Sequence, residues 1–331
     1  MSNIAETPAD VIIVGSYVQD HVWQTDRFPQ PGETRRALGF STGPGGKGFN
    51  QAIACVRQGG TILFIGALGN DGLALSARHF AESEKLACEW LILDNVPTAA
   101  AGIVVNTEGA NQIMVNLAAN EHLSAAFLRA QSTRFASARV LLVQLENNLD
   151  AVRTALELGR EHGLLAVLNP APMHADLDAQ LLSLCDVITP NETEFAQLIG
   201  RFNASETRAE EVVRMDDSAL HQLCRGLGVA SVVITLGAEG CFVSHAGGTL
   251  RGDDVDHYRV RAEKVHAIDT TGAGDSFSGA LVAMLSKAPT PAFIDAVRHA
   301  NRVAAMSTEK PGAALAIPHF NEVVTRFDAP D

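Results

Sequence analysis

Short apolar runs alternate with helix-like segments from about residue 120 onward, and this alternation limits the folds open to the chain. We expect strands at Val140–Leu145, Ala166–Asn169, Asp186–Thr189, Val232–Leu236 and Cys241–Ser244. Helical patterns fill the intervals, at Asn148–His162, Ala175–Leu184, Glu192–Leu198 and Asp217–Gly226. Strands that are apolar throughout are typical of a parallel sheet covered on both faces by helices.

The N-terminal part predicts more of this sheet and a second, smaller one. Strands at Val11–Val14 and Thr61–Ile65 and helices at Asn50–Arg57 and Asp71–Ser83 continue the main pattern. Residues 99–105 and 112–116 flank a four-residue turn and indicate a hairpin. We expect it to pair with the turn-rich residues 17–40. Residues 203–216 are charged and lack apolar periodicity, so we interpret them as a solvated surface insertion.

Composition excludes several classes of function. The 331 residues carry 25 Lys and Arg against 38 Asp and Glu, a formal net charge of −13. Such an acidic chain is not expected to bind nucleic acid or an anionic membrane surface. Its five cysteines are scattered and form no CxxC pair, which indicates reduced thiols, a cytoplasmic protein and no zinc site.

The segment Asp269-Thr270-Thr271-Gly272-Ala273-Gly274-Asp275 precedes an apolar helical run. Small residues at a helix start leave backbone N–H groups free to hold an anion, and the helix dipole adds to this effect. Asp275 would lie beside that site and could accept a proton from a hydroxyl. An ordinary helix cap explains the segment equally well when it is taken alone.

Polar residues also follow several of the expected strands, where open α/β sheets bind ligands. Asp20 follows the first strand, Glu146 the strand at 140–145, and Asn191 the strand at 186–189. The glycine-rich residues 43–50 fail the GxxxxGK[ST] spacing of a P-loop, and we expect them to be a loop that approaches a ligand closely. No GxGxxG opens the first helix, so a nicotinamide-binding domain is unsupported.

Five ordered motifs resemble those of the PfkB carbohydrate kinases, and within them those of the ribose kinases, over about residues 11–318. They are Gly45-Gly46-Lys47-Gly48-x-Asn50-Gln51-Ala52, Gln144-Leu145-Glu146, Asn169-Pro170-Ala171-Pro172, Thr189-Pro190-Asn191-Glu192-Thr193-Glu194, and Asp269 to Asp275 followed by x-Phe277-x-Gly279. The resemblance implies one α/β kinase domain over residues 1–331. It would be a three-layer α/β/α domain with a mostly parallel central sheet and a small β-sheet lid, at about 17–42 and 98–117.

The resemblance also implies an activity, the ATP-dependent phosphorylation of the primary 5-hydroxyl of D-ribose. A kinase of 2-deoxyribose, or of another sugar or a nucleoside, is the alternative. A sugar-binding regulator without catalysis is disfavoured, because Asp275 and the glycine loop are intact. The family's dimers, which pair through their lids, imply a homodimer here.

Site residues follow from the same resemblance. Asp275 corresponds to the base, and the amides of Gly272, Ala273 and Gly274 to the anion hole. The sugar-binding positions are Asp20, Gly46, Lys47, Gly48, Asn50, Glu146 and Asp275. The ATP-binding positions are Asn191, Thr235, Leu236, Gly237, Ala238, Glu239, Gly240, Gly274 and Asn301. Glu194 corresponds to an acid that organises Mg²⁺ and phosphate. A monovalent cation site, for K⁺, corresponds to Asp269, Thr271, Ser307, Lys310 and Gly312.

Three departures from the family pattern bear on the substrate and the cation. Val18 stands where an Asn often binds a sugar hydroxyl. An apolar side chain cannot form that bond and would suit a 2-deoxy sugar. Phe49 replaces the usual Ala, and it either reshapes the sugar pocket or packs beneath the lid hinge. Ala316 stands where a Ser often helps to hold the cation, so K⁺ dependence stays open.

Overall fold

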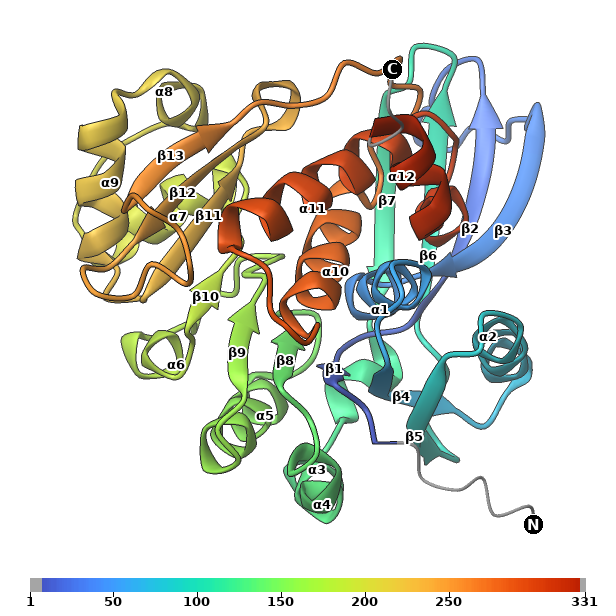
Figure 1. Cartoon of the computed structure of the whole chain (residues 1–331). Coiled ribbons are helices and arrows are strands. Elements are labelled where there is room, and N and C mark those ends of the chain that lie inside the picture. The colour runs from blue at the N-terminus through green and yellow to red at the C-terminus, as the bar shows by residue number, and fades with distance from the viewer. Residues whose placement is uncertain (1–7, 328–331) are drawn as a thin grey trace.

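A nine-stranded sheet forms the centre of the computed structural model, which describes residues 8–327 (Figure 1). The strand order is β13-β12-β11-β10-β9-β8-β1-β4-β5. Neighbouring strands from β5 to β11 are parallel, whereas β12 is antiparallel to both of its neighbours, β11 and β13. The bounds are β1 Val11–Val14, β4 Ile62–Gly69, β5 Ala87–Leu93, β8 Val140–Val143, β9 Leu165–Leu168, β10 Val187–Ile188, β11 Ser231–Thr235, β12 Cys241–His245 and β13 His257–Val260.

Successive side chains of a strand point to opposite faces of the sheet, and here both sets are apolar. Helices therefore cover both faces. In β1, Val11 and Ile13 face one helical layer, and Ile12 and Val14 face the other. The first layer holds α1 Lys47–Arg57, α2 Gly72–Ser83, α10 Ala273–Leu285, α11 Phe293–Ser307 and α12 Phe320–Phe327. The second holds α3 Ala125–Ala130, α4 Ser132–Phe135, α5 Leu149–Glu161, α6 Ala179–Ser183, α7 Glu192–Phe202, α8 Ala209–Arg214 and α9 Asp217–Gly226. The expected α/β/α architecture is confirmed.

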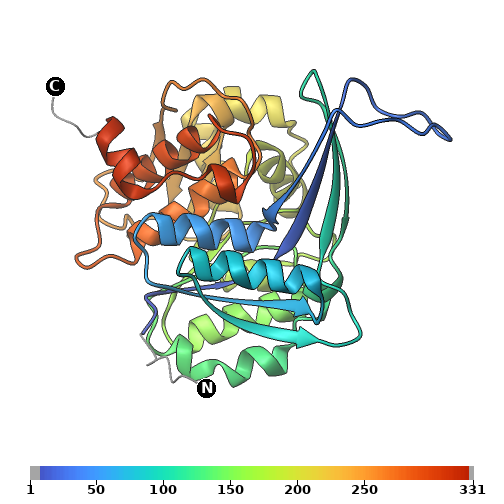
Figure 2. The same cartoon turned by 90° about the vertical axis from the view of Figure 1, so that its right-hand side faces the viewer.

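A second sheet, of four strands in the order β3-β2-β6-β7, stands apart from the main body (Figure 2). Its strands are β2 Val18–Thr25, β3 Gly39–Gly45, β6 Ala100–Asn106 and β7 Asn111–Asn116. β6 and β7 form the expected hairpin, and β6 pairs in parallel with β2. The prediction of a small separate sheet is therefore confirmed.

We expected the glycine-rich residues 43–50 to form a loop, and this expectation is wrong. Strand β3 continues to Gly45, and α1 begins at Lys47 rather than at Asn50. The change from strand to helix takes place at Gly46, whose φ of 89° lies in the left-handed region that glycine tolerates. A Cβ on Gly46 would also lie 2.7 Å from the backbone N of Val18, so close packing requires glycine there.

Two expectations about the C-terminal half are wrong. The strand at Cys241–Ser244 is antiparallel to β11, because the connection of residues 236–240 is too short for a parallel crossover. Residues 203–216 are not fully solvated, since they include α8 and Val212 is completely buried in the core. A helix of six residues is too short for its apolar period to be visible in the sequence. Strands β5 and β13 were not anticipated.

Phe49 resolves one of the alternatives that the sequence left open. Its side chain is fully buried and meets the rings of Tyr17 and Phe64 edge to face, with centroids 5.0 and 5.6 Å away. Such pairs add stability beyond the buried area. Phe49 therefore packs in the core, which favours the second alternative, a packing role.

Two further observations describe the chain as a whole. Its five cysteines are free thiols, and Cys88 is the one among them that is not buried. Within residues 8–327, no helix combines the length and apolar character needed to span a bilayer.

Candidate active site

Asp275 lies in the first turn of α10 and is almost completely buried. Both of its carboxylate oxygens accept hydrogen bonds from α1. Asn50 Nδ2 donates to Oδ2 and Gln51 Nε2 donates to Oδ1, each at 3.0 Å. Burial raises the pKa of Asp275, while nearby Lys47 and these two amides oppose the rise. Two helices thus hold one desolvated carboxylate in a fixed orientation.

Gln51 is the residue that joins this carboxylate to the strand ends. Besides Asp275, its Nε2 lies 3.1 Å from Asn169 Oδ1, and its Oε1 accepts a hydrogen bond from Gln144 Nε2. Asn169 in turn donates to the carbonyl of Thr189 at 2.9 Å. The polar residues that follow β8, β9 and β10 therefore form one network behind Asp275. Gln51 was quoted in a motif but not predicted as a site residue.

Lys47 and Glu146 form the next part of the cluster. Glu146 Oε2 accepts from the backbone N of Lys47 at 2.9 Å and from Ser16 Oγ at 2.5 Å. Burial alone would lower the pKa of Lys47, but the carboxylates of Asp275, Glu146 and Glu194 together raise it. The ammonium group is thus the positive centre among several acids.

Asp20 reaches the same cluster from the small sheet. It lies in β2 rather than at an end of the main sheet, and it pairs with Gly43 of β3. A Cβ on Gly45 would lie 2.2 Å from Asp20 Oδ2, so the carboxylate packs directly over this glycine. Burial, then the charges of Glu146 and Asp275, raise the pKa of Asp20 to about 7.

Asn50 presents an unused acceptor at this cluster. Its side chain is 5% exposed, and its Oδ1 has no hydrogen-bond partner among the described residues. Since Nδ2 is occupied by Asp275, Oδ1 is left for a ligand. A buried acceptor without a partner costs about 1–3 kcal/mol, which a bound hydroxyl would recover.

A cavity of about 700 Å³ opens on the other side of the start of α10. Its lining includes eight of the predicted ATP-binding positions, namely Asn191, Thr235, Gly237, Ala238, Glu239, Gly240, Gly274 and Asn301. Leu236 is buried and does not line the cavity, and neither does Glu194. Residues 261–265 form a further wall that the sequence did not indicate.

The start of α10 separates the carboxylate cluster from this cavity. Gly272 has a φ of 73°, the left-handed conformation that lets the chain turn into the helix. Ala273 and Gly274 line the cavity, and Asp275 faces α1. Free N–H groups of a helix start stabilise an anion. A phosphate in the cavity and a hydroxyl at Asp275 would therefore meet here.

Glu194 and Asn191 cap α7 at the edge of the cavity. Asn191 Oδ1 accepts from the backbone N of Glu194 at 2.8 Å, and Glu194 Oε2 accepts from the backbone N of Asn191 at 2.9 Å. Burial raises the pKa of Glu194, against the opposing effects of the Asn191 hydrogen bond and the charge of Lys47.

The five predicted cation residues lie in two adjoining segments, residues 269–271 and the stretch from the end of α11 at Ser307 to Gly312. Asp269 Oδ1 accepts from the backbone N of Thr271 at 2.9 Å, and Oδ2 from the backbone N of Gly312 at 2.8 Å. The side chains of Ser307 and Lys310 are engaged elsewhere. Ser307 Oγ donates to the carbonyl of Ala304, and Lys310 Nζ lies 3.8 Å from Glu322 on the surface. Only backbone groups of these two residues remain for a ligand.

Comparison with known proteins identifies the family. The model of the pfkB family carbohydrate kinases matches residues 8–319. The chain belongs to this family. It is 35% identical to a ribokinase of Haemophilus influenzae, with 94% of this chain and 96% of the relative covered. A deoxyribokinase of Salmonella typhi is 30% identical, over 82% of this chain and 83% of its own.

A solved structure of a kinase in complex with a nucleotide agrees in fold. The structure of a ribokinase from Cryptococcus neoformans var. grubii serotype A, in complex with ADP, superposes with a TM-score of 0.79. It is 27% identical and covers 96% of this chain and 100% of its own. The protein is therefore an ATP-dependent carbohydrate kinase of the PfkB family, with the α/β fold and small sheet expected from its sequence.

Asn301 gives a test of the cavity as the nucleotide site of this PfkB kinase. Its Nδ2 donates to the carbonyl of Arg261 at 2.7 Å and so holds the wall formed by residues 261–265. We expect Asn301→Leu to raise the KM for ATP about 5- to 10-fold, since a hydrogen bond contributes about 1 kcal/mol. The KM for the sugar should stay unchanged, as measured by steady-state kinetics.

Asn203→Leu is the matched control for this substitution. Asn203 Nδ2 also donates to a backbone carbonyl, that of Leu223, at 2.8 Å, but it lies away from the cavity. Loss of this hydrogen bond should lower the stability of the protein without changing the KM for ATP. Equal changes in both variants would contradict the assignment of the cavity to ATP.

Proposed function

We propose that this kinase transfers the γ-phosphoryl group of ATP to the primary 5-hydroxyl of D-ribose. The observation that carries the proposal is the arrangement at the start of α10. One buried carboxylate, Asp275, faces the polar cluster of α1, and the glycine turn beside it faces the 700 Å³ cavity. The ribokinase relative of Haemophilus influenzae supports ribose as the acceptor.

The proposed reaction assigns a role to each part of the cluster. Asp20, Asn50 and the Gly46–Gly48 turn bind the sugar hydroxyls, with Lys47 and Glu146 beside them. Asp275 takes the proton from the 5-hydroxyl. The oxygen of that hydroxyl attacks the γ-phosphorus, and the bond between the γ-phosphorus and the bridging oxygen of the leaving ADP breaks. The N–H groups of Gly272, Ala273 and Gly274 stabilise the charge on the transferring group. Phosphoryl transfer depends chiefly on such positioning and charge stabilisation.

Magnesium belongs to the proposed substrate complex. Mg²⁺ bound to the ATP phosphates would neutralise charge on them and orient the γ-phosphoryl group. The structure offers a carboxylate of suitable chemistry at the edge of the cavity, that of Glu194, and oxygen ligands are those that Mg²⁺ prefers. Lys47 lies close enough to lower the pKa of Glu194, against the larger effect of burial, and so helps to keep it ionised.

We propose a monovalent cation between residues 269–271 and the stretch from the end of α11 to Gly312. Burial alone would raise the pKa of Asp269, but hydrogen bonds from Thr271 and Gly312 hold it below the usual value, so a negative charge stays there. We propose that backbone carbonyls of these segments bind K⁺. Ala316 supplies no hydroxyl, and it is buried, so this side chain adds no ligand. The cation would order the glycine turn without contacting substrate.

A kinase of 2-deoxyribose is the second candidate, supported by the deoxyribokinase of Salmonella typhi. Val18 is consistent with it, because an apolar side chain forms no bond to a 2-hydroxyl. Val18 also has a structural role, since it is 3% exposed and packs with Ala99 and Ala101 at the base of the small sheet. The cytoplasm is the proposed compartment, in keeping with five free thiols.

Sugar turnover by the purified protein tests the function. We expect ADP release with Mg-ATP and ribose, faster than with 2-deoxyribose, other pentoses, hexoses or nucleosides, and stimulated by K⁺. Asp275→Asn should lower kcat about 10²- to 10⁴-fold, the range for loss of a general base, while ribose binding by calorimetry persists. Absence of ribose turnover would refute ribose as substrate. Turnover retained in Asp275→Asn would refute the base assignment.

The pH profile tests how Gln51 controls Asp275. Gln51 lowers the pKa of a carboxylate that burial raises, and Asp275 accepts a proton only when ionised. Loss of the donor in Gln51→Met should raise that pKa further. The acid limb of kcat/KM then moves to higher pH, by about 1 unit for a hydrogen bond to a charged group.

Gln58→Met is the matched control, because Gln58 is equally buried at the other end of α1. It donates to the carbonyl of Pro318 at 2.8 Å and lies outside the carboxylate cluster. Its acid limb should coincide with that of the wild type. If Gln51→Met, folded by circular dichroism, also keeps the wild-type limb, Gln51 does not tune the base.

The outer face of the small sheet supports the proposed homodimer. The register of β2, β3, β6 and β7 places His21, Trp23, Phe40 and Met114 on one face, which we call the lid patch. Trp23 and Phe40 lie with ring centroids 5.1 Å apart, and Met114 is 81% exposed. Exposed apolar groups gathered on one face mark interaction sites. A second copy of the lid patch would cover them.

Light scattering after size-exclusion chromatography tests this dimer. The wild type should have twice the mass of one chain at micromolar concentration, and Phe40→Glu/Met114→Glu should have the mass of one. Leu75→Glu controls for added charge, since Leu75 on α2 is 61% exposed and does not belong to the lid patch. A wild-type monomer, or a dimer that persists in the double variant, would exclude this interface.

A further inference from the structure

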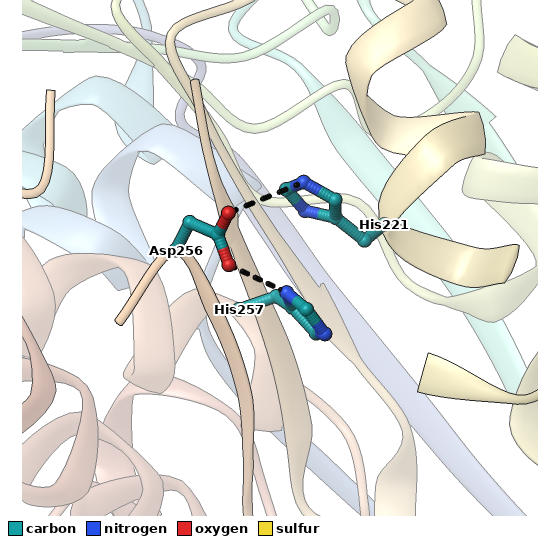
Figure 3. Close-up of side chains that lie close together, drawn as sticks. All are labelled: His221, Asp256 and His257. Atoms are coloured by element: carbon teal, nitrogen blue, oxygen red, sulfur yellow. Dashed lines mark hydrogen bonds and ion pairs between the residues drawn. The ribbon is translucent and has the colours of Figure 1, made fainter. Parts of the chain in front are cut away.

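Two histidines and one aspartate gather on the surface at the edge of the main sheet, outside the kinase site (Figure 3). His221 comes from α9, His257 begins β13, and Asp256 precedes it. One nitrogen of each imidazole and one carboxylate oxygen all lie within 4.8 Å of one another. Within the described chain, none of the three lines the nucleotide cavity. We propose that this cluster binds a divalent transition-metal ion of the Zn²⁺ class.

The orientation of His221 is fixed by its neighbours. Its Nδ1 lies 2.8 Å from Ser244 Oγ, which also accepts a hydrogen bond from Arg225 Nε at 3.1 Å. A proton on Nδ1 satisfies that contact and leaves the lone pair of Nε2 directed at Asp256. Metal-binding histidines are commonly held in this manner, with the non-ligating nitrogen donating to a second group.

The gap between His221 and Asp256 is suited to an ion. Nε2 lies 3.8 Å from Asp256 Oδ2, which is too long for a hydrogen bond. Zn²⁺ binds imidazole nitrogen at about 2.0–2.1 Å and carboxylate oxygen at about 2.0–2.2 Å. Two such ligands of one tetrahedral ion lie about 3.4 Å apart, so a small movement of the exposed Asp256 would close the geometry.

His257 supplies the third ligand. Its Nδ1 lies 2.7 Å from Asp256 Oδ1, a hydrogen bond that a bound ion would replace, and its ring stacks on that of His221 with centroids 4.6 Å apart. The β12–β13 register pairs His257 with Ser244, the residue that holds His221, so the sheet itself brings the group together. The two imidazoles and Asp256 are partly or largely open to solvent, which gives an ion access.

The ligand chemistry selects the kind of metal. Imidazole suits Zn²⁺, Cu²⁺ and Ni²⁺, whereas Mg²⁺ and Ca²⁺ prefer oxygen ligands. Three protein ligands leave one position of a tetrahedral ion for water. The ion would tie α9 to β13, the edge strand, which is otherwise linked to α9 by the 2.6 Å contact between Arg259 Nε and Asp217 Oδ1.

Metal titration of the full chain tests the proposal. Protein stripped with a chelator is titrated with Zn²⁺ against a chromophoric chelator, in excess Mg²⁺ that saturates oxygen sites. We expect one Zn²⁺ per chain, bound at least 10-fold more weakly by His221→Asn/His257→Gln. His221→Asn keeps a donor toward Ser244 but has no nitrogen in place of Nε2. Co²⁺ should give the visible absorption of a tetrahedral complex in the wild type and not in His221→Asn/His257→Gln.

Two controls make the outcome decisive. His79→Asn/His122→Gln removes two exposed histidines elsewhere and should bind Zn²⁺ like the wild type. The kinase activity of His221→Asn/His257→Gln in Mg-ATP should equal that of the wild type, which establishes that the variant is folded. Wild-type protein without stoichiometric Zn²⁺ binding, or a double variant that binds Zn²⁺ as tightly, would overturn the proposal.

Discussion

The close contact between α1 and α10 is the constraint on which the rest of the site depends. A Cβ on Gly279 would lie 2.2 Å from the carbonyl oxygen of Gln51, so the two helices touch backbone to backbone. At that distance Asn50 and Gln51 of one helix reach Asp275 of the other with 3.0 Å hydrogen bonds. A larger residue at 279 would separate the carboxylate from both donors. Helix packing therefore sets the orientation of the acid.

Burial and charge are balanced around that carboxylate. Desolvation favours its neutral form, and Glu146 adds to this effect, whereas Lys47 and the two amides favour the charged form. None of residues 8–327 donates a hydrogen bond to the carboxylate of Asp20, and its pKa rises to about 7. Two acids of one cluster are thus held differently by their hydrogen bonds. A proton acceptor needs this combination, because full solvation would weaken its basicity and an unopposed rise would leave it protonated.

The sequence was sufficient for the features that depend on local pattern. Alternating apolar runs predicted the main sheet, and the turn at 106–109 predicted the hairpin of the small one. Motif order brought Asp275, Asn50 and Glu146 into one hypothesis, and the structure gathers their elements. Contacts between distant segments could not be read in this way. The network of Gln51 and the cavity wall at 261–265 depend on packing, which no local period records.

Strand β3 of the small sheet continues directly into helix α1, and this connection explains why glycine is required at positions 45 and 46. Strand β3 passes through Gly45, which makes room for the carboxylate of Asp20, and Gly46 then turns the chain into α1. Lys47 follows immediately, with its backbone N bonded to Glu146. Any displacement of β3 therefore acts on Asp20 and on the start of α1 together. The residues of β2 and α1 that we propose to bind the sugar are therefore coupled through β3, so ordering one group favours ordering of the other.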